Sequence, residues 1–215
     1  PLTPAPATIG VEAGLFSAQA EVAGLSAKEK EEQWLALQGR CEKCTRCPLH
    51  RSRTRAVFGE GDQQARLVFV GEGPGAEEDR TGRPFVGRAG QLLDRIIAAM
   101  GMRRQEVYIC NVVKCRPPGN RTPSEEEIHT CWPYLEEQLA LLSPKVIVAL
   151  GGPAAKTLLK TNLGIMSLRG HWHRYQGVPV MPTYHPAFVL RQYTPAIRGE
   201  VWSDMQLVVK FLKEA

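Results

Sequence analysis

Short apolar runs alternate with amphipathic segments along most of this chain. Mostly apolar segments at 65–71, 106–114, 145–151 and 178–186 are typical of strands buried on both faces of a parallel sheet. Between them, apolar residues recur at helical spacing, and we predict helices at 28–40, 88–100, 121–143, 152–160 and 197–215. Strand and helix therefore alternate, which favours an α/β fold with a mostly parallel sheet.

Two helix boundaries can be read from the sequence. Gly39 is expected to end the first helix. Thr122 or Ser124 is expected to cap the helix at 121–143, whose first turn carries acidic residues where the helix dipole favours them.

The first 27 residues differ in composition from the rest. They are rich in Ala, Pro and Gly, and we expect a loose arm at 1–27 followed by a single domain at 28–215. The chain has no apolar run of membrane-spanning length, and its start lacks the pattern of a secretory signal, so we expect a cytoplasmic protein.

The net charge of the chain bears on the kind of partner it binds. The 215 residues carry a net charge of +5, and the sequence pI is about 9.0, so a nucleic-acid partner is plausible. Charge alone does not separate this interpretation from an ordinary solvated surface.

The stretch GEGPG follows the first predicted strand. A glycine-rich turn in that place can bind phosphate through backbone N–H groups. Here Pro74 removes one donor, three acidic residues follow, and no Gly-Lys-Ser/Thr is present. A turn that lets a ligand approach the backbone closely fits better.

Three further residues are candidates for ligand binding, each with a structural alternative. Phe85, between two glycines, either folds onto the core or offers a flat face to a ring. Asn111, in an apolar strand, either satisfies a neighbouring loop or presents a donor and an acceptor to an amide-imide edge. His185, at a strand end, is either structural or a hydrogen-bond donor to an oxygen that gains charge.

The segment after His185 is a candidate DNA contact. Phe188, Val189 and Leu190 form an apolar group, and Arg191 follows. An apolar wedge beside a cation can enter a base stack and hold a phosphate. Because strand ends meet at one edge of a parallel sheet, we expect all these segments to converge on one crevice.

The six cysteines favour metal chemistry over disulfides. Cys41, Cys44 and Cys47 are spaced C-x2-C-x2-C, and Cys115 and Cys131 lie far along the chain. Four thiolates accept either zinc or a 4Fe–4S cluster, and spacing does not choose between them. Cys110 lies in an apolar strand and is expected to pack in the core.

Taken in order, several segments resemble the family 4 uracil-DNA glycosylases, the iron–sulfur type. The resemblance covers roughly 80% of the chain, from about Cys44 to the closing helix. The segments that carry it are CTRCPLHRSRTRAVFGEG, VGEGPGAEEDRTGRPFVGRAGQLL, VYICNVVKCRPPGNRTP and YHPAFVLR.

The resemblance implies a three-layer α/β/α sandwich with a central four-stranded parallel sheet and a 4Fe–4S cluster rather than zinc. Matched motif by motif, the cluster ligands fall on Cys44, Cys47, Cys115 and Cys131. The catalytic motifs fall on Glu72, Gly73, Glu78 and His185. The substrate-binding positions fall on Phe85 and Asn111. From the residues themselves we add Gly75 and Asn120 as substrate-binding candidates and Leu190 and Arg191 as DNA contacts.

The expected activity is hydrolysis of the N-glycosidic bond of deoxyuridine in DNA, with the base flipped out of the stack. Asn120 stands where a relative in the superfamily has a histidine that bonds covalently to DNA. We therefore expect this enzyme to release its product and turn over rather than to be trapped on DNA. The expected partner is uracil-containing DNA, single- or double-stranded. We expect the protein to be a monomer that is associated with the prokaryotic nucleoid and does not bind membranes. The rival hypotheses are a non-catalytic, metal-stabilised nucleic-acid-binding protein and a nucleotide-binding domain.

Overall fold

The structure is a computed structural model that describes residue 22 and residues 24–215. The arm predicted at 1–27 falls mostly outside the described residues. Among the described helices, none has the length and apolarity needed to cross a bilayer.

A six-stranded sheet lies at the centre, in the order β1-β3-β2-β4-β6-β5. The four inner strands, β3, β2, β4 and β6, are parallel to one another, and the edge strands β1 and β5 are antiparallel to their neighbours. Their bounds are β1 Glu60–Gly61, β2 Leu67–Gly71, β3 Tyr108–Asn111, β4 Val146–Leu150, β5 His173–Tyr175 and β6 Val178–Thr183.

The parallel core of four strands was predicted, but the two edge strands were not. They are two and three residues long, too short for hydrophobic periodicity to indicate them.

Helices surround the sheet, most of them where the sequence predicts. The α-helices are α2 Ala27–Glu42, α3 Ala76–Thr81, α4 Arg88–Ala99, α5 Glu125–Leu142, α6 Gly152–Leu159, α7 Ile165–Leu168, α8 Pro186–Arg191 and α9 Pro195–Glu214. Short 3-10 helices lie at η1 Pro48–Arg51, η2 Arg104–Glu106 and η3 Pro118–Asn120.

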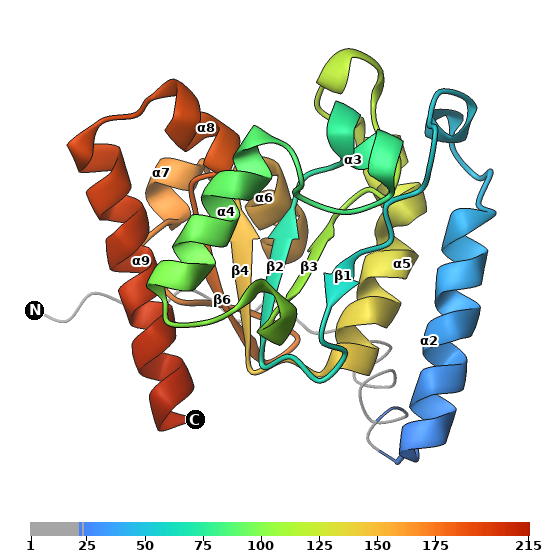
Figure 1. Ribbon diagram of the computed structural model, residues 1–215, viewed down its shortest axis with the longest axis horizontal. Helices are drawn as coiled ribbons and strands as arrows, with labels where there is room; N and C mark the ends of the chain where they lie inside the picture. Colours follow the sequence, from blue (N-terminus) through green and yellow to red (C-terminus); the bar gives the residue numbers. More distant parts are fainter. Residues whose placement is uncertain (1–21, 23) are drawn as a thin grey trace, which may run out of the picture.

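Alternating residues of each inner strand pack on opposite faces of the sheet. Leu67 and Phe69 of β2 join a core with α4 and α9, whereas Val68 and Val70 join a second core with α2, α5 and α6. All four side chains have no solvent exposure. The fold is thus the expected three-layer α/β/α arrangement (Figure 1).

Three boundaries differ from the sequence prediction or sharpen it. Helix α2 continues past Gly39 to Glu42, so Gly39 does not end it. Of the two candidate caps for α5, Ser124 is the one that accepts a hydrogen bond, from the Glu127 N–H. Strand β6 ends at Thr183, and His185 is the N-cap of α8.

The parallel strands bring their carboxyl ends to one side of the sheet. Figure 1 shows their arrowheads on the side where α3 and α8 lie. Glu72 follows β2, Asn111 ends β3, Gly151 follows β4, and His185 follows β6 after one residue. This edge therefore holds the segments that the sequence singles out.

Candidate active site

A cavity of about 690 Å³ opens at this edge of the sheet. Of the site residues predicted for catalysis, substrate and DNA, all but Leu190 line it: Glu72, Gly73, Gly75, Glu78, Phe85, Asn111, Asn120, His185 and Arg191. The predicted convergence of distant segments on one crevice is therefore present in the fold.

Phe85 and His185 form one wall of the cavity. Their ring centroids are 5.5 Å apart and the rings are tilted by 34°. Gly71, at the end of β2, makes room for this wall, because a Cβ there would come within 2.6 Å of the Phe85 Cζ. Phe85 is 6% exposed, so its ring presents an edge or face to the cavity rather than to bulk water.

Asn111 contributes an unsatisfied amide to the cavity. The residue is 1% exposed, and its Oδ1 has no hydrogen-bond partner among the residues that the structure describes. A buried acceptor left unpaired costs about 1–3 kcal/mol, so such groups call for an explanation. No neighbouring loop supplies a donor to this oxygen in the described residues, although Asn111 lines the cavity.

The imidazole of His185 is held in one tautomer. Its Nδ1 accepts a hydrogen bond from the backbone N–H of Ala187 at 3.1 Å, so in the neutral ring the proton is on Nε2. Burial, helped by the positive charge of Arg191, lowers the pKa of His185 to about 4. At neutral pH the ring is therefore an uncharged N–H donor. Gly151 at φ +92° lets the two segments meet, since a Cβ there would lie 2.9 Å from the His185 Cβ.

The two acidic candidates, Glu72 and Glu78, have different surroundings. Both Glu78 oxygens accept main-chain hydrogen bonds, from Val86 and Gly87 at 2.9 Å each and from Gly75 at 3.1 Å. Glu72 is half-buried, and burial raises the pKa of its carboxyl despite a hydrogen bond with Thr122. Glu72 is thus the carboxyl group better placed to exchange a proton, and Glu78 organises the loops around it.

The GEGPG turn supplies less donor capacity than its glycines suggest. The Gly75 N–H donates to Glu78 and caps α3, so in this conformation it is engaged within the protein. Gly73 packs against Val113, whose Cγ2 would lie 2.8 Å from an added Cβ. Of the turn, Gly73 remains as a possible backbone donor to a ligand.

The rim of the cavity is cationic. Arg88, Arg121 and Arg191 are exposed and line it beside one exposed carboxylate, Glu77, although the sequence pointed only to Arg191. Arg121 is also paired with Glu127 at 2.7 Å. Arg88 and Arg121 are near the starts of α4 and α5, where a search for helix starts beside strand ends could have found them. Leu190 lies outside the cavity and packs against the core beside α9, so its role as a DNA wedge stays a prediction.

A second, much smaller cavity lies among the cysteines. Cys41, Cys44, Cys47, Cys115 and Cys131 line it, together with the side chains of Arg53 and Lys114. Cys110 is fully buried and does not line it, as expected of a core residue. Within the described part of the chain, no group of three or more potential ligands is spaced to hold a metal ion.

One cationic and one backbone donor contact the cysteine sulfurs. The Arg53 Nη1 donates to the Cys115 Sγ at 3.0 Å, and the Lys114 N–H donates to the Cys131 Sγ at 3.3 Å. Burial raises the pKa of Cys41 to about 12 and that of Cys131 to about 11. Ligation requires thiolates, so a bound metal group must displace these protons, and the N–H donors favour the resulting charge.

Comparison with known proteins agrees with this geometry. Residues 58–206 match the family model described as the uracil DNA glycosylase superfamily. A type-4 uracil-DNA glycosylase of Thermotoga maritima is 47% identical over 189 residues, covering 86% of this chain and 97% of the relative. One of Pyrobaculum aerophilum is 48% identical over 174 residues, covering 77% and 88%. A type-5 uracil-DNA glycosylase of the same organism is 33% identical over 178 residues, covering 68% and 78%.

Proposed function

The chain belongs to the uracil-DNA glycosylase superfamily and, within it, to the type-4 enzymes, and from this premise we propose how its residues excise uracil from DNA. The enzyme is a DNA-repair glycosylase; the residue roles, the cofactor and the mode of DNA binding that follow are our proposals. The observation that carries them is the unpaired Asn111 Oδ1, buried in a cavity that Phe85 and His185 also line.

DNA binds first through its phosphates at the cationic rim. Arg88, Arg121 and Arg191 surround the mouth and neutralise phosphates on either side of the target nucleotide. The deoxyuridine then leaves the stack and enters the cavity, at a cost of a few kcal/mol that is smallest in a weak pair or a single strand.

Phe85 and Asn111 recognise the flipped base. The Phe85 ring stacks on the pyrimidine, and the Asn111 side chain pairs with its O4/N3 edge: Oδ1 accepts from N3–H, and Nδ2 donates to O4. Cytosine presents this edge with donor and acceptor exchanged, which leaves the buried amide mispaired at a cost of about 1–3 kcal/mol. The Glu78 loop closes the wall against the 5-methyl group of thymine.

His185 then stabilises the leaving group. As the C1′–N1 bond breaks, its electron pair moves onto uracil, and the charge develops on O2. The Nε2–H of neutral His185 donates to that oxygen, a contribution of about 3 kcal/mol for one well-placed donor, and the Gly73 N–H adds a second.

Water completes the reaction at C1′. Its oxygen bonds to the oxocarbenium-like carbon, and its proton passes to a base. Gly73 stands where other branches have a catalytic aspartate, and Glu72, half-buried with a raised pKa, is the carboxylate that takes this role. Glu78 is engaged with three main-chain N–H groups and keeps the site in shape.

The cysteine cavity fits an iron–sulfur group held by Cys44, Cys47, Cys115 and Cys131. Five thiols line this cavity, the four proposed ligands among them, and four cysteine thiolates are the ligand set of a 4Fe–4S cluster. The Arg53 guanidinium donates to the Cys115 Sγ and favours the thiolate form. When bound, the cluster supplies cross-links between distant segments rather than chemistry at the base. The proposed ligands come from α5, from the segment before η1 and from the loop after β3. That loop also lines the active-site cavity.

The activity is tested with an oligonucleotide that carries one uracil. Incubation followed by alkali should cut the strand at that position, because an abasic site is alkali-labile, and the matched oligonucleotide with thymine should stay whole. Intact uracil strands would contradict the assignment. Parallel assays with U:G, U:A and single strands establish which substrate is preferred.

The cluster is tested by the variant Cys115→Ser. Wild-type protein should contain about four iron atoms per chain, and the variant should lose most of the iron, its visible absorption and part of its thermal stability. Cys41→Ala is the matched control, because Cys41 lines the same cavity but is not a proposed ligand. Zinc in place of iron, or iron lost from Cys41→Ala alone, would refute the ligand set.

A further inference from the structure

The loop that carries Phe85 has a strained backbone. Phe85 has φ +49°, a left-handed conformation that glycine adopts readily but that is unfavourable for an aromatic residue. Such strain of about 1–3 kcal/mol persists only where the surroundings impose it. The chain must therefore contain groups that hold this loop in place.

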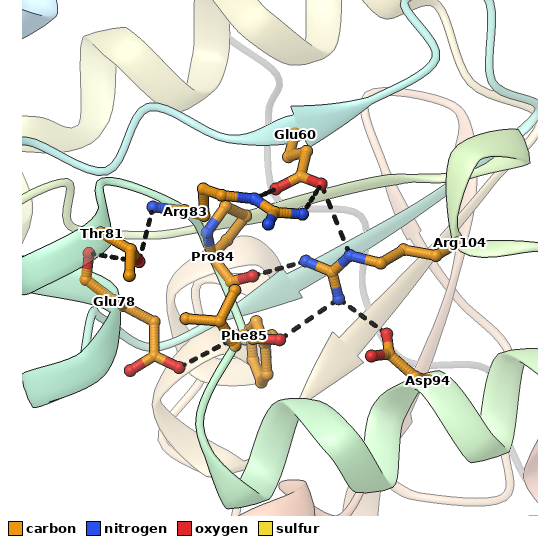
Figure 2. Close-up of polar contacts among 9 residues, drawn as sticks. Glu60, Glu78, Thr81, Arg83, Pro84, Phe85, Asp94 and Arg104 are labelled. Atoms are coloured by element: carbon orange, nitrogen blue, oxygen red, sulfur yellow. Dashed lines mark hydrogen bonds and ion pairs between the residues drawn. The ribbon is translucent and has the colours of Figure 1, made fainter.

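Two charged side chains, Arg104 and Glu78, hydrogen-bond to the loop backbone from opposite sides (Figure 2). Arg104 donates from Nη2 to the Pro84 carbonyl at 2.5 Å and from Nη1 to the Phe85 carbonyl at 3.2 Å. Glu78 accepts from the next two main-chain N–H groups, at 2.9 Å each. Four consecutive residues are thus tied by a cation on one side and an anion on the other.

The guanidinium is itself fixed by two carboxylates. Its Nη1 donates to the Asp94 Oδ1 at 2.7 Å, and its Nε lies 3.7 Å from the Glu60 Oε1. Glu60 also binds Arg83 at 2.7 and 2.8 Å, so the start of the loop joins the same network. The Arg104 side chain is only 15% exposed, and these partners fix the orientation of its planar guanidinium group.

Helix α4 limits where the Phe85 carbonyl can move. A Cβ on Gly90 would come within 1.8 Å of this oxygen, so the loop packs directly on the helix backbone. Arg104 is absent from the residues that line the cavity, and it therefore stands behind Phe85 rather than against the substrate.

We propose that Arg104 is a positioning residue for uracil recognition, which holds the Phe85 ring in the cavity through the Pro84 and Phe85 carbonyls. The proposal rests on the stacking role proposed for Phe85. Without the two hydrogen bonds, the loop relaxes out of its left-handed conformation and the ring no longer faces the base. Stacking acts on the bound substrate and on the transition state alike, so its loss raises KM more than it lowers kcat.

A four-protein cycle tests this: wild type, Arg104→Gln, Phe85→Ala and the double variant. On a single-stranded uracil oligonucleotide, Arg104→Gln should raise KM about 10-fold and change kcat less than about 3-fold, since base–aromatic stacking accounts for about 5- to 150-fold in binding. In the Phe85→Ala background the same substitution should change KM less than about 2-fold, because the two residues act through one contact. Arg104→Lys keeps the charge and one donor and should fall between.

The neighbouring Arg103→Gln is the matched control. It removes the same charge and an exposed pair with Glu106, and it should leave KM unchanged. Asp94→Asn offers a milder variant that keeps Arg104 in place and should raise KM about 3-fold, again only when Phe85 is present. It serves as the test if Arg104→Gln does not fold.

The outcomes separate the two proposals. Equal losses from Arg104→Gln in both backgrounds, with a lower melting temperature, would show a purely structural role and overturn the inference. A KM that stays at the wild-type value in Arg104→Gln would overturn it as well. If Phe85→Ala itself leaves KM unchanged, the stacking role fails, and the inference falls with it.

Discussion

Replacement of His185 by alanine is expected to lower kcat for uracil excision by about 10²- to 10³-fold, the usual cost of removing one donor to a developing oxyanion. KM should change little, because the hydrogen bond to O2 strengthens only as the C1′–N1 bond breaks. Single-turnover rates on a uracil oligonucleotide measure this effect separately from product release. A loss confined to KM would contradict the role.

The pH dependence of the same residue checks its charge state. His185 has a folded pKa of about 4, below its ordinary value of 6.5, so the native ring stays neutral at neutral pH. Between pH 6.5 and about 4 the His185 ring binds a proton in the unfolded chain but not in the native protein. The free energy of unfolding therefore falls as the pH drops through this window. A His185→Gln variant should lack this part of the decline. A rate that rises or falls with a pKa near 6.5 would show that His185 titrates freely.

The pattern of apolar residues was sufficient to predict the parallel core of the sheet. Runs such as 146–150 are apolar throughout because the strands are buried on both faces. Because parallel strands end at the same edge of the sheet, the segments that follow them meet there. Phe85, Asn111 and His185 accordingly line one cavity.

The parts that were not predicted depend on contacts between distant residues. Helix α3 has six residues, three of them acidic, and its start is stabilised by the Glu78 carboxylate, which accepts from the Gly75 N–H. A left-handed Phe85 has no signal in the local sequence, and one of the groups that bind its loop, Arg104, lies 19 positions away. The cationic rim was likewise hidden, since an isolated arginine is usually only a solvated surface residue.

Two amide side chains are buried among the described residues, and they show how a site differs from a core. Gln138 is fully bonded: its Nε2 donates to the Phe58 carbonyl and to the Tyr108 hydroxyl, and its Oε1 accepts from Lys114. Asn111 is as deeply buried, yet its Oδ1 has no partner in the described part of the chain. The Tyr175 hydroxyl is also buried without a partner, but it lies away from the active-site cavity. Burial without a partner therefore singles out Asn111 only together with its place in the cavity.

Replacement of Asn111 by leucine is expected to reduce kcat/KM on uracil DNA by about 100-fold, because two hydrogen bonds to the O4/N3 edge are lost and the base faces an apolar group. The free energy of unfolding should stay the same or rise, since the substitution removes a buried acceptor that no residue satisfies. Gln138→Leu is the control: it removes one of the two acceptors of the buried Lys114 Nζ, leaves the Phe58 carbonyl without its Gln138 donor, and should destabilise the fold by about 2–4 kcal/mol. Denaturant titration and uracil excision, measured on both variants, give the comparison. If Asn111→Leu unfolds as easily as Gln138→Leu, or keeps its activity, the Asn111 amide is part of the core and another group must recognise the base.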